Sequence, residues 1–311
     1  MGAEGKFLAR AGAHVQIEKD GSVIVAVGNT EMGQGARTVL AQVASEALGI
    51  PYEKVDVIPS DTTRIPDSGP TVASRTTVMS GNAILNACHP LRQRIDKVVR
   101  MVLKGRPLDK VNAGNGYYRL AGKKRKVSYQ EVIEKCYALR EHMASQGWYK
   151  VQGTSFDRKS GRGDAYFTYT FSTMACEVEV DMETGQVQVL RFISSHDIGK
   201  AVNPQLAEGQ IQGGALQGIG YALMENLVLK DGIILNPNFT GYTIPTAKDT
   251  PELVSIIVEK PYPEGPYGAK GLGEPPLICA APAVTNAIFN ATGIRVRKIP
   301  AIPEEILELK G

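Results

Sequence analysis

Four segments of the sequence place glycines or hydroxyl-bearing residues at the expected start of a helix, and such junctions can bind anions. Backbone N–H groups in the first turn of a helix have no partner within the helix, and the helix dipole adds positive potential there. One junction of this kind is an ordinary cap or turn, but four in one chain predict a large anionic ligand. The segments are residues 31–35, 73–77, 203–210 and 268–276.

One carboxylate in the last of these segments is a candidate general base. Glu274 lies between Gly273 and Pro275-Pro276. The glycine lets the backbone pass close to a neighbour, and a proline can open a helix. The local sequence alone favours a helix N-cap or a first-turn acid. The choice between a catalytic and a capping carboxylate therefore stays open at this point.

Other kinds of site are disfavoured by the spacing of their residues. No GxxxxGK[ST] motif is present, and residues 33–38 lack the third glycine of a dinucleotide-binding loop. A dyad of His196 and Asp197 is disfavoured because adjacent residues in a strand point to opposite faces. The histidines form no i, i+4 pair and the cysteines no CxxC, so protein-ligated zinc or iron–sulfur is not indicated. These residues are His14, His89, His142 and His196, with Cys88, Cys136, Cys176 and Cys279.

Periodicity predicts the elements that would position these segments. Alternation on both sides of Asp20-Gly21 predicts a hairpin, and a 3–4 spacing of apolar residues predicts a helix that ends at Gly49. A second, longer helix from about residue 78 to 102 would bend at Pro90. Further strands are expected at 55–58, 167–181, 186–193 and 254–259, and further helices after 132, over 209–220 and over 277–288. The fold class that follows is α+β, with mixed sheets and packed helices.

Composition limits the classes of partner. The chain has 311 residues, is 43% hydrophobic, and intersperses 35 basic with 32 acidic residues for a net charge of +3. No single-sign field marks it for nucleic acid or an anionic membrane, and the basic run at 104–126 is interpreted as a solvated face. No apolar stretch is long enough to span a bilayer, and residues 1–10 lack the apolar core of a signal peptide, so a cytoplasmic location is expected.

Four motifs occur in the order and spacing of one family. The chain resembles the molybdopterin-binding subunit of the molybdenum hydroxylases, which include xanthine dehydrogenase, aldehyde oxidase and oxidoreductase, and nicotinate dehydrogenase. The resemblance runs from about residue 8 to the end, but it matches only the C-terminal half of that subunit. The motifs are GNTEMGQG at 28–35, PTVASRT at 70–76, DIGKAVNP at 197–204 followed by Gly209-Gln210, and KGLGEPP at 270–276.

The resemblance implies the fold of the second molybdopterin-binding domain of the xanthine dehydrogenase family, with a first lobe over 1–155 and a second over 156–311. It gives Glu274 the role of the catalytic base, and it brings the backbone N–H of Ala73 closest to molybdenum. It places Ala3 and Glu4 where the family lines its substrate pocket. At Val72-Ala73 the chain departs from bacterial aldehyde oxidoreductases, which often have glycines there. The implied cofactor-binding residues are Gly33, Gln34, Gly35, Ala73, Ser74, Arg75, Thr76, Asn203, Gln210, Lys270, Gly271 and Gly273.

The resemblance also implies a reaction and partners. A molybdenum held by molybdopterin, in the cytosine dinucleotide form, would support hydroxylation of a nicotinate-like or purine-like heterocycle or an aldehyde, with oxygen from water. Electrons would leave through iron–sulfur clusters and FAD on partner subunits, because four scattered cysteines cannot hold such clusters. Since the chain starts almost directly on a strand, a second polypeptide would supply the missing half, as in nicotinate dehydrogenase. Two alternatives are a non-catalytic structural or maturation partner with the family fold and a different glycine-rich nucleotide-binding enzyme.

Overall fold

A computed structural model describes residues 10–151 and 153–310, so the predicted substrate-side positions Ala3 and Glu4 lie outside the described residues. The chain forms two compact units. Unit 1 is Met1–Tyr169 with Pro261–Gly271, and unit 2 is Thr170–Lys260 with Leu272–Gly311. The expected division after residue 155 lies earlier in the chain than this one. The difference arises because the stretch before Thr170 is held in unit 1, where the Tyr262 hydroxyl donates to the Phe167 carbonyl at 2.9 Å.

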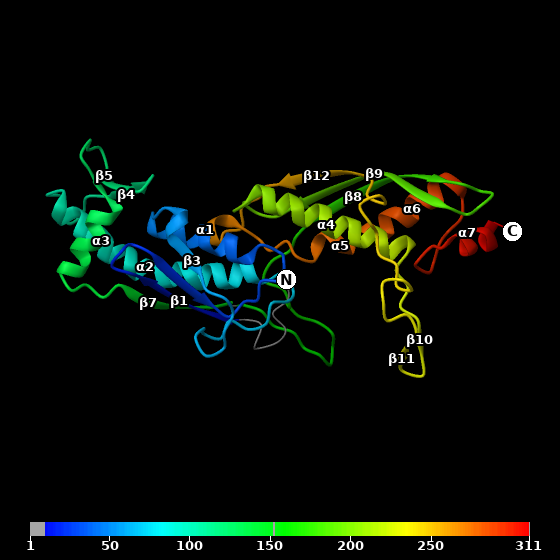
Figure 1. Cartoon of the computed structure of the whole chain (residues 1–311), viewed down its shortest axis with the longest axis horizontal. Helices are drawn as coiled ribbons and strands as arrows, with labels where there is room; N and C mark the ends of the chain where they lie inside the picture. Colours follow the sequence, from blue (N-terminus) through cyan, green and yellow to red (C-terminus); the bar gives the residue numbers. More distant parts are fainter. Residues whose placement is uncertain (1–9, 152, 311) are drawn as a thin grey trace. The chain divides into compact units, whose positions relative to one another are not determined.

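Unit 1 is built on a four-stranded sheet of order β3-β2-β1-β7 (Figure 1). The predicted hairpin is confirmed as an antiparallel pair of β1 and β2, and the Asp20 carboxylate accepts from the backbone N–H of Ser22 at its turn. The third strand, β3, pairs with β2 in parallel after the short helix η1. These elements are β1 Arg10–Ile17, β2 Val23–Val27, η1 Tyr52–Lys54, β3 Val55–Val57 and β7 Ala144–Lys150.

Two helices pack together in unit 1, and α2 also packs on the sheet. The first, α1 (Ala36–Leu48), ends at Gly49, whose left-handed backbone donates to the last turn. The second, α2 (Thr76–Val102), continues through Pro90 as one helix. Its fully buried side chains, such as Ile84 and Leu91, recur every three to four residues as predicted. Both predicted helices are thus confirmed.

The basic side chains between α2 and β7 are exposed, as expected of a solvated face, and their backbone is regular. It forms a three-stranded antiparallel sheet of order β4-β5-β6, followed by α3. A capping box starts α3, in which Ser128 and Glu131 exchange hydrogen bonds. The predicted helix after residue 132 is confirmed, whereas the strands were missed because each has only three or four residues. The elements are β4 Val111–Gly114, β5 Tyr117–Leu120, β6 Lys126–Ser128 and α3 Tyr129–Ala138.

Unit 2 is a sheet of order β12-β9-β8 with helices packed against it (Figure 1). The predicted strand pair is confirmed as β8 (Ser172–Val180) and β9 (Val187–Asp197), and β12 (Glu252–Val258) pairs with β9 in parallel. The helix predicted over 277–288 divides at Cys279 into α5 (Pro275–Ile278) and α6 (Ala280–Thr292). The other elements are α4 Pro204–Leu223, β10 Leu229–Lys230, β11 Ile233–Ile234 and α7 Pro303–Lys310.

The core of unit 2 joins its sheet to α4 and α6. Phe192 of β9, Ile219 of α4 and Val284 of α6 are buried in one hydrophobic cluster. The predicted α+β class, with mixed sheets and packed helices, is confirmed. Among the described residues, no helix is both long and apolar enough to cross a bilayer.

Candidate functional site

A carboxylate of the loop before α1 binds backbone N–H groups of the same loop and of the first turn of α1. The Glu31 carboxylate accepts hydrogen bonds from the backbone N–H groups of Gly33 and Gly35, both at 2.9 Å, and of Arg37 at 3.0 Å. Partial burial acts to raise the pKa of Glu31, but these hydrogen bonds outweigh burial and lower the pKa below its ordinary value of 4.5. The N–H groups that were expected to cradle a ligand therefore hold a side chain of the same loop.

The side chain of Gln34 folds back on this loop. Its Oε1 accepts from the Met32 N–H at 2.7 Å, and its Nε2 donates to the Thr30 carbonyl at 2.8 Å. The Met32 side chain beside it is 68% exposed. Internal hydrogen bonds thus fix the loop in shape and leave its outer surface open.

The loop before α2 is held in an unusual backbone conformation. Ala73 and Ser74 have φ of 54° and 50°, in the left-handed region that non-glycine residues rarely adopt. Such residues cost about 1–2 kcal/mol each and persist where surrounding structure over-determines them, most often at functional sites. Thr76 begins α2, and its Oγ1 accepts from the buried Asn29 at 3.3 Å. This contact ties the loop before α2 to the end of β2.

The constraint on this loop comes from Arg75. Its side chain is 1% exposed, and its guanidinium donates to the carbonyls of Ser68 at 2.7 Å, Pro70 at 2.9 Å and Arg10. A buried guanidinium with its donors on backbone carbonyls fixes the turn that it spans. Arg75 therefore braces the loop from inside.

A distant predicted segment meets this loop in unit 1. A Cβ at Gly271 would lie 1.7 Å from the Ser74 carbonyl oxygen, so only glycine allows the two backbones to come this close. The adjacent Lys270 donates from Nζ to the Tyr169 carbonyl at 2.8 Å. Within unit 1, the structure therefore brings together two of the segments singled out in the sequence.

The remaining predicted residues belong to unit 2. Asn203 caps α4, since its Oδ1 accepts from the Leu206 N–H at 3.0 Å, and Gln210 follows in the second turn. Close packing explains one glycine of α4 but not another. A Cβ at Gly214 would lie 2.6 Å from Pro276, which explains this glycine by close helix packing, whereas a Cβ at Gly209 would meet nothing within 4 Å.

Glu274 stands at the start of α5, one residue after the exposed Gly273. Its side chain is exposed, and in the part of the chain that the structure describes it makes no capping hydrogen bond to α5. Because Gly214 packs against Pro276, α4 supports the turn on which Glu274 lies. Glu274 thus occupies the N-cap position that the local sequence favoured, although in the described structure its side chain makes no cap hydrogen bond to α5.

No group of three or more metal-ligating side chains occurs among the described residues. The His196 imidazole is buried against Ser194, with Nε2 and Oγ 2.7 Å apart, and burial lowers its pKa. Its Nδ1 has no hydrogen-bond partner in the described structure.

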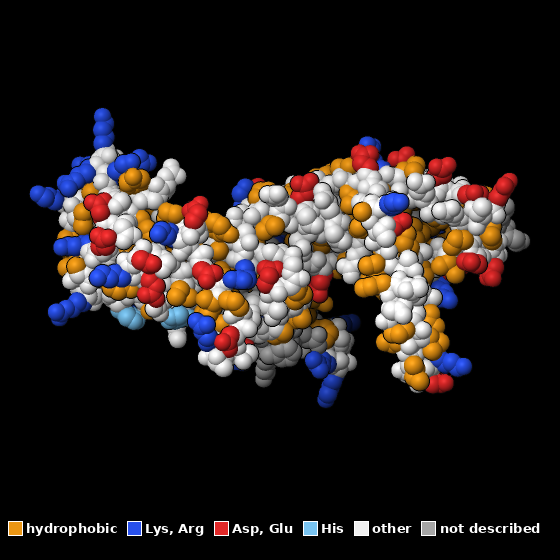
Figure 2. All heavy atoms as spheres, in the orientation of Figure 1, with side chains coloured by type: hydrophobic (Ala, Val, Ile, Leu, Met, Phe, Trp, Pro, Cys, Tyr) orange, Lys and Arg blue, Asp and Glu red, His pale blue; other side chains and the backbone are white. Residues whose placement is uncertain are grey.

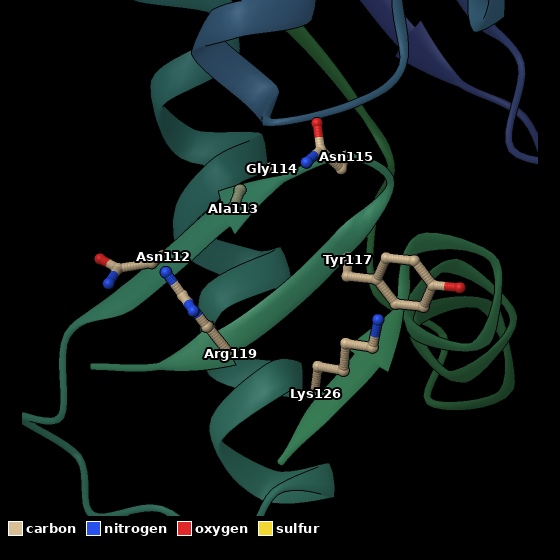
Figure 3. Close-up of a pocket in the computed structure, with 7 residues that line it drawn as sticks. All are labelled: Asn112, Ala113, Gly114, Asn115, Tyr117, Arg119 and Lys126. Carbon is tan, nitrogen blue, oxygen red and sulfur yellow. The ribbon is translucent and has the colours of Figure 1, made fainter. Parts of the chain in front are cut away.

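A hollow of about 250 Å³ lies on the small sheet of unit 1 (Figure 3). The Lys126 ammonium stacks over the Tyr117 ring, 3.8 Å from its centroid. None of the residues predicted from the sequence to bind a cofactor lines this hollow. Its lining residues are Asn112, Ala113, Gly114, Asn115, Tyr117, Arg119 and Lys126.

Two contributors to the site were missed at the level of sequence. Glu31 was read as part of a loop and not as the anion at its centre, although an acidic residue shortly before a helix start is a capping signal. Arg75 was predicted only as a cofactor-binding residue, which stays a prediction, and the role of its buried side chain under the loop was not predicted. The burial of a single arginine leaves no mark in the local sequence.

Comparison with known proteins gives one consistent result. Residues 1–251 match the family model of the molybdopterin cofactor-binding domain. The xanthine dehydrogenase molybdenum-binding subunit of Escherichia coli O157:H7 is 32% identical over 96% of this chain and 39% of its own length. The gamma subunit of the 6-hydroxypseudooxynicotine dehydrogenase complex of Paenarthrobacter nicotinovorans is 32% identical over 94% of this chain and 36% of its own length.

A solved structure is similar to this chain over nearly its whole length. Quinoline 2-oxidoreductase from Pseudomonas putida 86 superposes with a TM-score of 0.84 and 26% identity, over 97% of this chain and 38% of the other. The chain therefore spans less than two fifths of the length of each of these relatives.

Proposed function

Because the chain belongs to the molybdopterin cofactor-binding domain family, we propose that it binds molybdopterin and supplies the catalytic base of a molybdenum hydroxylase. The match to this family model confirms the family that the sequence predicted. The observation that carries the proposal is the contact of the left-handed Ala73-Ser74 backbone with Gly271. Strain at a loop and a backbone approach that excludes any Cβ are typical of sites that bind a ligand through the main chain.

The residues present fit such a cofactor. The proposed ligands in unit 1 are the loop around Gln34, residues 73–76 and Lys270-Gly271, and in unit 2 they are Asn203, Gln210 and Gly273. Because internal hydrogen bonds already engage the N–H groups of Gly33 and Gly35 and the Gln34 amide, this loop would contact the cofactor through its outer surface. At residues 73–76 and at the start of α4, backbone N–H groups suit the phosphate and pterin of such a group. The Ala73 N–H is proposed to lie nearest the metal.

The bound cofactor supplies two-electron redox chemistry at molybdenum. Glu274 is proposed to accept the proton of the water that provides the inserted oxygen, a role that needs an ionised carboxylate within hydrogen-bond reach. Gly273 and Pro275 hold this carboxylate on a short turn that packs against α4 through Pro276. A positioned base of this kind contributes roughly 10²- to 10⁴-fold in rate.

The proposed substrate class is a nitrogen heterocycle, nicotinate-like or purine-like, with aldehydes as the second class. The names of the quinoline, xanthine and 6-hydroxypseudooxynicotine enzymes among the similar proteins support this order. The finer proposals are a cytosine dinucleotide form of the cofactor, a second polypeptide or segment that completes the subunit, and iron–sulfur and FAD partner subunits that take the electrons.

The test is to purify the tagged chain with its natural partners and to measure molybdenum by mass spectrometry and pterin by fluorescence. We expect stoichiometric molybdenum and pterin, with cytidine monophosphate released on hydrolysis. Gly271→Ala should lower the molybdenum content at least tenfold, while Gly114→Ala, at a glycine with open space for a Cβ, should retain it. A complex without molybdenum would support the non-catalytic alternative and refute the proposal.

A further inference from the structure

The segment that connects α4 to β12 in the sequence of unit 2 forms a narrow arm (Figure 1). The arm comprises residues 226–244, and its regular structure is the two-residue hairpin of β10 and β11, which pair Leu229 with Ile234 and Lys230 with Ile233. A two-stranded hairpin is at best marginally stable in water without a surface to pack on.

Large apolar side chains cover this arm. Eight of them are between 40% and 76% exposed, which is unusual for so short a segment, and Figure 2 shows hydrophobic side chains among other atoms along the arm. A contiguous exposed apolar surface is typical of a protein interface. The side chains are Leu227, Val228, Leu229, Ile233, Ile234, Leu235, Phe239 and Ile244.

Polar groups fix the shape of the arm. The Asn236 amide accepts from the Val228 N–H at 2.9 Å and donates to the carbonyls of Asn226 at 2.7 Å and Gly241 at 3.2 Å. At the base, the Tyr242 hydroxyl donates to the Glu225 carboxylate at 2.6 Å, and this bond raises the pKa of Tyr242 to about 12. The apolar side chains are therefore not needed to hold the arm together, and they remain available for a partner.

The chemistry of the arm limits what can cover it. Between residues 226 and 244 the only charged side chains are Lys230 and Asp231, both at the tip. A neutral, apolar surface matches the remainder, since burying unpaired charges against it would be costly. Burying these eight side chains against such a surface would contribute favourably to the contact.

The similar proteins are much longer than this chain, and their remaining part is a candidate partner for the arm. This chain spans 36–39% of the length of its similar xanthine and 6-hydroxypseudooxynicotine dehydrogenase subunits, so most of each relative lies outside the aligned part. We propose that the arm docks onto an apolar surface of that remaining part of the molybdopterin-binding subunit, whether it is carried on this polypeptide or on another. This inference rests on the proposed function, because it takes the chain to be one part of such a subunit.

Photo-cross-linking in the assembled complex tests the proposal. A benzophenone amino acid replaces Phe239, which is 76% exposed, and mass spectrometry identifies the cross-linked peptide. We expect peptides whose sequence matches the part of the relatives that this chain does not span. Cross-links only to unit 1 of this chain, to a second copy, or to an iron–sulfur or flavin subunit would overturn the proposal, as would an intact complex without cross-links.

A pair of variants gives an independent readout. Ile233→Ser on the arm, at 66% exposure, should weaken the complex at least tenfold, whereas the control Leu309→Ser on α7, at 48% exposure, should leave it unchanged. Both variants should keep the wild-type circular dichroism spectrum and melting temperature. Equal affinity of the Ile233→Ser variant and wild type would contradict the docking role.

Molybdenum content separates the two proposals. A complex with stoichiometric molybdenum whose arm cross-links elsewhere refutes the docking surface and leaves the proposed function intact. A complex that lacks molybdenum but gives the expected cross-links supports the docking surface and refutes the proposed function.

Discussion

The loops before α1 and α2 were both predicted to bind an anion at a helix start, yet different contacts hold them. Before α1, the Glu31 carboxylate occupies the backbone N–H groups of Gly33, Gly35 and Arg37. Before α2, Ala73 and Ser74 keep a left-handed backbone. A buried arginine lies below this second loop, and Gly271 meets its backbone. Hydrogen bonds to its own carboxylate hold the first loop, whereas the second loop is strained, held from inside by Arg75 and contacted by Gly271. A glycine- or hydroxyl-rich helix start therefore does not by itself identify a free anion-binding site.

The largest effect on folding should come from the brace of the second loop. Arg75→Met removes the donors to the carbonyls of Ser68 and Pro70 and leaves the Ser68 acceptor buried without this donor. We expect a loss of about 3 kcal/mol in the free energy of unfolding, measured by urea titration. Arg119→Met on the exposed face of β5 is the control and should change it by less than about 0.5 kcal/mol. Equal stability of the two variants would remove the brace from the account.

The close approach at Gly271 should have the next largest effect. Gly271→Ala would set a Cβ 1.7 Å from the Ser74 carbonyl oxygen, so the two backbones must move apart. Overpacking of this kind costs about 1–3 kcal/mol, which a thermal melt can detect. By contrast, Gly209→Ala in α4 meets nothing within 4 Å and should stabilise the helix by about 1 kcal/mol. The opposite order of the two melting temperatures would refute this packing.

The first loop should depend on pH. Glu31→Gln removes a charged acceptor of three N–H groups and should destabilise the chain by about 1–2 kcal/mol at pH 7. Since the folded state lowers the pKa of Glu31, its contribution is complete above the ordinary pKa of 4.5 and is lost as the pH falls through the lowered value. Urea midpoints of the variant and wild type should therefore converge in acid, and a constant difference down to pH 2 would contradict the assignment.

The smallest effect is expected from relieving strain in the second loop. Ala73→Gly removes the Cβ at a φ of 54°, and the gain is offset by the greater chain entropy of glycine in the unfolded state. We expect a change within about 1 kcal/mol, neutral or stabilising, in the free energy of unfolding. A marked loss of stability would mean that the left-handed conformation is not strained.

Much of the fold could be predicted from the sequence because its signals are local. The Asp20-Gly21 turn, the end of α1 at Gly49 and the alternation in β8 and β9 each specify an element through neighbouring residues. The small sheet β4–β6 was not predicted, since strands of three or four residues are too short to show a clear alternation. The return of Pro261–Gly271 to unit 1 depends on contacts that no linear boundary can express.

The candidate site was predictable in outline only. The segments around Ala73 and Gly271 were chosen for their composition, and the structure joins them. The roles of Glu31 and Arg75 could not be predicted, because each depends on which backbone groups the fold turns toward the side chain. The assignments of Glu274, Asn203 and Gln210 to the cofactor remain predictions.

We propose that Glu274 acts as a base beside a molybdopterin that this chain helps to hold. The direct measurement is molybdenum content and turnover of the Glu274→Gln variant in the assembled complex, with the exposed Glu308→Gln of α7 as the matched control. We expect both variants to keep stoichiometric molybdenum, and only Glu274→Gln to lose turnover, by roughly 10²- to 10⁴-fold. Near-normal turnover of Glu274→Gln with full molybdenum would contradict the account.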